Sequence, residues 1–168
     1  MTEIERMLNQ YELVLHGDAW HGDAIWKILD GISAGCAAHR PLADAHTIWE
    51  IVMHMTFWEN VAARRLAGQR AGLDEALDFP AMPSATEANW QKTLEGFGAS
   101  NQEFRAALAK LHAARLDERS AAGKRSFYDE AHGLTQHDVY HAGQIRAVEE
   151  GICGAARVRR FVILQCEC

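Results

Sequence analysis

Residues 126–151 read SFYDEAHGLTQHDVYHAGQIRAVEEG, and this stretch predicts a long amphipathic helix near the end of the chain. Ser126 and Asp129 have the spacing of a helix cap, and Gly151 is a typical helix stop. Between them, apolar residues recur at steps of three and four, the spacing at which side chains share one side of a helix. The face predicted to be buried consists of Phe127, Ala131, Leu134, His137, His141, Ile145 and Val148. Two histidines therefore lie on this face.

The same helical spacing appears near the N-terminus. Apolar residues follow it over 4–15, the pattern is interrupted at Gly17, and it resumes over 25–32. Asp18 is the candidate N-cap of the second part. The segment is predicted to be either one kinked helix or two pieces in line.

A second helix is predicted to start at a candidate N-cap, Asp44, and to end at Gly68. It carries His54 beside its apolar stripe. Residues 68–83 then hold two glycines and two prolines without a sustained period. They are expected to form a long surface crossover, which permits bundle topologies other than a simple up-and-down order.

A third helix is indicated by Ser84 and Glu87, which have the spacing of a capping box. Its apolar residues follow alternating steps of four and three as far as Leu111. No strand pattern competes over the first 150 residues. Long helices with short joins and one long connection predict an all-α four-helix bundle over residues 1–151.

Composition narrows the class of protein. The formal charge is -6 and basic residues are dispersed, so nucleic acid is not an expected partner. No apolar run is long enough to span a bilayer, and the first residues lack the pattern of a secretory signal. The four cysteines do not form a secreted disulfide framework, which indicates reduced thiols and a cytoplasmic location. The tail, residues 152–168, is left unassigned, and its Cys166 and Cys168 are expected at a frayed terminus.

The nine histidines are the unusual feature of the composition. His137 and His141 are four residues apart, so on a helix their imidazoles stand one above the other and can bind one ion. His54 would join them from a different helix. The alternative is that all three are core histidines, each of which would need a hydrogen-bond partner. Spacing alone favours a metal site and leaves both interpretations open.

Two segments, HTIWEIVMH at 46–54 and HDVYHAGQI at 137–145, resemble the signature segments of the DinB-like (DinB/YfiT) metal-binding superfamily. The resemblance covers most of residues 1–150 and does not include the tail. Further matching pieces are AWHGDAIWKILDGI at 19–32, PLADAHTIWE at 41–50 and LAG at 66–68.

The resemblance implies a four-helix bundle with a long connection, a homodimer, and a three-histidine site for one divalent ion, zinc or nickel above all. Carried over position by position, the ligands are His54, His137 and His141. His21 and His46 lie in the similar segments without being ligands, and hydrogen-bonded structural roles are expected for them. Three neutral imidazoles would leave the ion at least one open position, unlike a closed four-ligand structural site.

Some members of this family depend on thiols. The bacillithiol transferases and the mycothiol-dependent maleylpyruvate isomerase use the metal to hold a low-molecular-weight thiol as thiolate. The resemblance therefore favours a metal-dependent enzyme, either a thiol-dependent S-transferase or a small-molecule hydrolase, with a thiol or small molecule as its partner. The alternative is a stress-related dimeric scaffold that binds metal without catalysis.

Residues near the predicted ligands have two interpretations each. Glu50 lies one turn before the ligand of its helix and is the candidate general acid or base, although a solvated carboxylate is the favoured alternative. Gln144 is expected to touch a ligand or to cap the core. Asp138 and Tyr140 are expected to point away from the histidine stripe, towards packing or surface positions. Trp58 is the aromatic residue best placed to line a pocket beside the metal.

Overall fold

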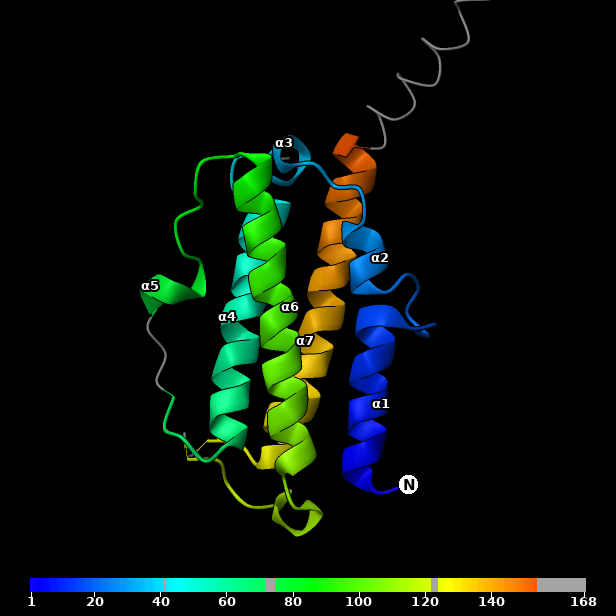
Figure 1. Ribbon diagram of the computed structural model, residues 1–168, viewed down its shortest axis with the longest axis vertical. Helices are drawn as coiled ribbons and strands as arrows, with labels where there is room; N and C mark the ends of the chain where they lie inside the picture. The colour runs from blue at the N-terminus through cyan, green and yellow to red at the C-terminus, as the bar shows by residue number, and fades with distance from the viewer. Residues whose placement is uncertain (41, 72–74, 122–123, 154–168) are drawn as a thin grey trace, which may run out of the picture.

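The computed structural model describes residues 1–40, 42–71, 75–121 and 124–153, and a bundle of four long helices dominates it (Figure 1). The predicted all-α four-helix bundle is confirmed. The long helices are α1 (Glu3–His16), α4 (Ile48–Leu66), α6 (Glu87–Lys110) and α7 (Phe127–Val148). The short elements are α2 (Ile25–Leu29), α3 (Ala34–Ala37), α5 (Glu75–Asp78), the 3-10 helix η1 (Ala113–Arg115) and the π-helix η2 (Glu149–Cys153). Within the described ranges no residue belongs to a strand.

The order of the long helices is not a simple up-and-down order. In Figure 1, α1 and α7 run upward, whereas α4 and α6 both run downward. The long connection predicted between α4 and α6 makes this arrangement possible, because it returns the chain along the outside of the bundle. This connection carries α5, a short helix that the sequence did not predict. α4 packs against both α6 and α7, so its buried faces are turned towards the interior of the bundle.

The start of α4 is fixed by a capping box. The Thr47 hydroxyl accepts a hydrogen bond from the Glu50 amide, and the Glu50 carboxylate accepts one from the Thr47 amide. The predicted N-cap, Asp44, was therefore wrong by three residues. The next residue, Ile48, is fully buried, so the helix begins where the chain enters the core. The predicted stop is confirmed, because Gly68 follows the helix with a φ of +80°, a conformation that favours glycine.

The other helix starts give a mixed result. α7 begins with the predicted capping box of Ser126 and Asp129. α6 is capped by Thr86, which accepts from the Asn89 amide, and not by the predicted Ser84. At the N-terminus, α1 and α2 are separate helices, so of the two predicted alternatives the two pieces are found and the single kinked helix is not. Asp18 does not cap the second piece, because that helix starts at Ile25.

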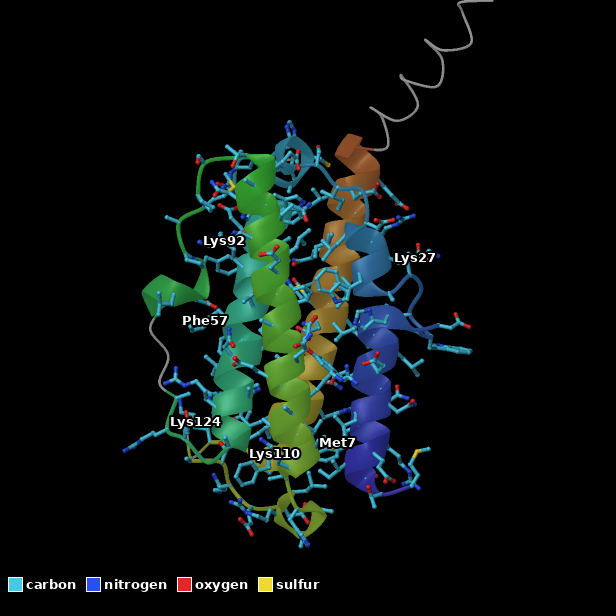
Figure 2. All side chains as sticks on the ribbon, in the orientation of Figure 1. Met7, Lys27, Phe57, Lys92, Lys110 and Lys124 are labelled. Atoms are coloured by element: carbon cyan, nitrogen blue, oxygen red, sulfur yellow. The ribbon has the colours of Figure 1, made fainter. Side chains whose placement is uncertain are left out.

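Large side chains from all four long helices fill the interior. Figure 2 shows the side chains of the bundle directed between the helices, while Lys27, Lys92 and Lys110 are exposed outside it. The largest fully buried side chains include Trp49, Trp90, Tyr11, Phe97, Phe104 and Phe127. Among the described residues, no helix combines the length and apolar character needed to cross a bilayer.

One expectation about the cysteines was wrong. Cys36 is disulfide-bonded, whereas the scattered cysteine positions predicted reduced thiols. Spacing in the sequence could not reveal this bond, because pairing depends on the distance between residues in the folded chain. Cys166 and Cys168 lie outside the described residues, as does most of the tail.

Candidate metal centre

Two neighbouring helices bring three histidine side chains to one point. α4 contributes His54, and α7 contributes His137 and His141. Nε2 of His137 lies 3.0 Å from Nε2 of His54 and 3.1 Å from Nε2 of His141. In the part of the chain that the structure describes, this is the only group of three or more metal-binding side chains with ligand atoms this close, all within 4.8 Å. The three residues predicted as ligands are thus brought together.

The outer ring nitrogens of two of these histidines have acceptors. Nδ1 of His54 lies 3.0 Å from the backbone oxygen of Asp78 and 2.9 Å from its carboxylate. Nδ1 of His141 lies 2.7 Å from Oε1 of Gln144, so of the two roles expected for Gln144 the contact with a ligand candidate is the one found. Each acceptor favours the tautomer in which Nδ1 carries the proton and Nε2 carries a lone pair.

His137 has a similar partner in Asp138, whose Oδ1 lies 3.3 Å from Nδ1 of His137. Asp138 therefore contacts a ligand candidate, although it was expected to point away from the histidine stripe. Its full burial matches the packing position, one of the two that were expected for it. α7 contacts α1, α2 and α4, so its buried face is wider than the histidine stripe and includes this position. Tyr140, by contrast, is 63% exposed, as predicted for a surface position.

The lone pairs of the three Nε2 atoms repel one another, and a bound cation would turn this repulsion into attraction. A neutral imidazole carries one N–H, and in all three rings an acceptor is available for that hydrogen at Nδ1. The Nε2 lone pairs then face one another at 3.0 and 3.1 Å, which is repulsive. Zinc bonds of about 2.0–2.1 Å at tetrahedral angles would separate two nitrogens by about 3.3 Å. The donor set and its spacing therefore fit a divalent transition-metal ion.

Burial keeps these imidazoles in their neutral form. It lowers the pKa of His54, although hydrogen bonding to Asp78 partly offsets the effect. It also lowers the pKa of His137. Burial, followed by repulsion from His137, lowers the pKa of His141 to about 4. At pH 7 all three rings are neutral, which is the form that binds a metal.

The crossover supplies two residues to the site that the sequence did not reveal. Asp78, the last residue of α5, accepts a 2.7 Å hydrogen bond from Nε1 of Trp58 in addition to its contacts with His54. The next residue, Phe79, stacks on His54 with a centroid distance of 4.1 Å, and on His46 at 3.8 Å. Both stacks are nearly parallel, so the Phe79 ring lies between the two imidazoles. The sequence of this crossover has no sustained helical period, so neither Asp78 nor Phe79 was predicted to reach the site.

We expect Asp78→Ala to lower zinc affinity by about tenfold, the low end of the range for residues that orient a ligand. The carboxylate that fixes the His54 ring would be lost, while the backbone oxygen of residue 78 would remain as an acceptor. Competition with a chromophoric chelator measures the change, and Asp117→Ala, at an exposed position, is the control. An affinity equal to that of the control would show that Asp78 does not orient the ligand.

Glu50, the candidate acid or base, takes part in the start of α4. One carboxylate oxygen lies 2.5 Å from the Arg40 guanidinium and the other accepts from the Thr47 amide at 2.8 Å. His46 lies 3.7 Å from the same carboxylate. Partial burial raises the pKa of Glu50, but the bonds from Thr47 and Arg40 outweigh it and lower the pKa overall. An acid or base role for Glu50 stays a prediction.

A buried polar network lies behind the histidines. The Glu59 carboxylate is fully buried and accepts hydrogen bonds from Tyr11 at 2.6 Å, from Asn101 at 2.6 Å and from Ser100. Burial, reinforced by the nearby Asp138 carboxyl, raises the pKa of Glu59 well above its usual value. Burial likewise raises the pKa of Asp138. Glu59 was missed as a site-related residue, although it falls on the buried stripe of α4 and its charge conflicts with that position.

His137 is the ligand candidate that reaches a cavity. Its side chain is 27% exposed, and together with Trp58 it lines a pocket of about 210 Å³ between α4 and α7. The prediction that Trp58 lines a pocket beside the site is confirmed. The pocket is lined by Trp58, Ala62, Arg65, Arg125, Glu130, Gly133, Leu134 and His137. A bound ion would therefore have an approach for a small molecule on this side.

Comparison with known proteins identifies a family. A family model described as the DinB superfamily matches residues 19–145, which is more than half of the chain. The matched range includes all three clustered histidines. No curated protein and no solved structure matched the chain.

Proposed function

The chain belongs to the DinB superfamily, and from this premise and the geometry of its histidines we propose that it is a metal-dependent enzyme. Its nucleophile would be a low-molecular-weight thiol in an S-transfer reaction, or water in the hydrolysis of a small molecule. The observation that carries the proposal is the convergence of three Nε2 atoms on one point beside a pocket. A scaffold that only binds metal needs no such approach.

The proposed ligands are His54, His137 and His141, and the proposed ion is zinc or nickel. When bound, such an ion supplies Lewis-acid activation of the nucleophile. Three protein ligands are typical of catalytic sites, which keep a position for water or substrate. The pocket lined by His137 supports an open position on that side.

Other side chains of the site would hold this arrangement in place. Asp78 and Gln144 fix the ring orientation of His54 and His141 through Nδ1. Phe79 covers one face of His54 and so excludes water from it. Trp58 is held by its bond to Asp78 and presents an apolar wall to the pocket. The reactants would thus meet a rigid site with one open side.

The experiment is a turnover assay with protein loaded with zinc or nickel. Glutathione, bacillithiol and mycothiol are each tested for transfer to monochlorobimane, and nitrophenyl acetate is tested for hydrolysis. We expect turnover with at least one substrate that disappears on metal removal and in His141→Ala. Glu50→Gln is included as a separate arm, in which loss of turnover with unchanged metal content would support its proton-transfer role.

Metal binding without metal-dependent turnover of any of these substrates would overturn the proposed enzyme. The non-catalytic scaffold would then be the better interpretation, and it predicts a homodimer whose mass in solution does not depend on any substrate. A protein that binds neither zinc nor nickel would contradict both interpretations.

A further inference from the structure

The end of the pocket away from the histidines carries two arginines, Arg65 and Arg125. Glu130 lines the same pocket, so its lining has one more positive than negative side chain. This local excess of positive charge contrasts with the formal charge of the whole chain, which is -6. The positive charge is therefore a property of the pocket and not of the protein surface in general.

Arg65 is held in place and only partly paired. Its Nη1 lies 3.0 Å from the Glu130 carboxylate, and both side chains are largely buried. Its guanidinium lies over Trp58, 5.9 Å from the ring centroid. Its Nε is buried without a hydrogen-bond partner, so one ion pair does not satisfy the five N–H donors of this side chain.

Arg125 contributes a second guanidinium with free donors. Its side chain is exposed, and among the residues that the structure describes it has no carboxylate within 4.0 Å. Its charge acts on the Asp129 carboxyl, whose pKa is lowered mainly by hydrogen bonds from Ser126 and to a lesser extent by Arg125. It lies close to α7 at Gly133, where an added Cβ would come within 3.7 Å of Nη1 of Arg125. Gly133 also lines the pocket, so the free guanidinium stands at its wall.

Arg65 and its ion-pair partner Glu130 lie on the same side of the three histidines. α4 runs downward and α7 upward, so Arg65, after His54, and Glu130, before His137, are displaced in the same direction (Figure 1). His137 is seven positions after Glu130, which corresponds to about 11 Å along a helix axis. Trp58 lies between the two ends, with its ring centroid 6.1 Å from that of His137.

We propose that this pocket binds substrates that carry a carboxylate, with Arg65 and Arg125 holding the carboxylate while the reacting group faces the histidines. The inference rests on the proposed function and adds the substrate class. A planar guanidinium matches a carboxylate through two parallel hydrogen bonds. Because one positive charge remains after Glu130 is counted, the pocket suits a single carboxylate better than a phosphate of nearly two negative charges. The volume of about 210 Å³ restricts the ligand to a small molecule.

The test compares two thiols of equal length, 6-mercaptohexanoate and 6-mercapto-1-hexanol, on protein loaded with cobalt. Thiolate-to-cobalt absorption reports binding at the metal without any catalytic assay. We expect the acid to bind about tenfold more tightly than the alcohol, as a charged hydrogen bond would give. Arg125→Gln should remove most of this preference, and Arg65→Met should do the same if it folds.

Arg70→Gln is the matched control, because it removes one exposed positive charge outside the pocket. It should leave the preference for the acid unchanged. Equal affinities for the two thiols would overturn the inference while cobalt binding upheld the metal site. So would a preference that survives Arg125→Gln, or one that falls equally in Arg125→Gln and in the Arg70→Gln control. A protein that takes up no cobalt would overturn the proposed function, and the substrate class with it.

Discussion

Replacing His141 by alanine is expected to lower the affinity of the protein for zinc by more than about 100-fold, beyond the effect typical of residues that only orient a ligand. His141 would supply one of three protein bonds to the ion, and its Nε2 lies 3.1 Å from Nε2 of His137. Its loss would leave two imidazoles, which bind an ion far less tightly than three. Competition with a chromophoric chelator gives the affinity, and metal analysis after dialysis gives the occupancy.

The control is His132→Ala on the same helix. His132 is exposed and contacts Gln136, so it shares a helix with the ligands but not the site. We expect its zinc affinity to equal that of the wild type. Circular dichroism of both variants separates loss of a ligand from loss of the fold. Undiminished zinc affinity in a folded His141→Ala protein would refute the three-histidine site.

The architecture could be predicted because helical patterns are local. Steps of three and four located the four long helices, and Gly68 marked the end of α4 through a backbone conformation that glycine favours. Helix starts were less predictable, because several polar residues in a row can each serve as a cap. Thr47 caps α4 in place of Asp44 because the chain becomes buried again at Thr47 and Ile48, whereas Asp44 is exposed.

The candidate site was only partly predictable. His137 and His141 share a helix, so spacing placed them together, whereas His54 was assigned to the site through family resemblance. Asp78 reaches His54 from a crossover without a period, and no pattern links their positions in the sequence. Contacts between segments far apart in the chain depend on the packed fold, which is why the residues that orient the ligands were missed.

The buried carboxylate of Glu59 is expected to be the most sensitive position for stability. Glu59→Leu would leave the Tyr11 hydroxyl, the Ser100 hydroxyl and the Asn101 amide without their acceptor inside the bundle. Leaving one buried donor without its acceptor costs about 1–3 kcal/mol, so loss of the acceptor shared by three buried donors costs at least about 3 kcal/mol. We therefore expect the free energy of unfolding in urea to fall by about that amount, with a smaller loss in Glu59→Gln, which keeps one oxygen acceptor.

Glu103→Leu on α6 is the matched control, since Glu103 is exposed and its loss should change the free energy of unfolding by less than about 0.5 kcal/mol. The network also contacts the site, because Asp138 lies beside Glu59 and its Oδ1 is 3.3 Å from Nδ1 of His137. Glu59→Leu should therefore weaken zinc binding as well as the fold. If the leucine variant were as stable as the wild type, apolar packing alone would suffice at this position. The polar network would then have to be explained by its contact with His137, and zinc affinity in the same variant would measure that contribution directly.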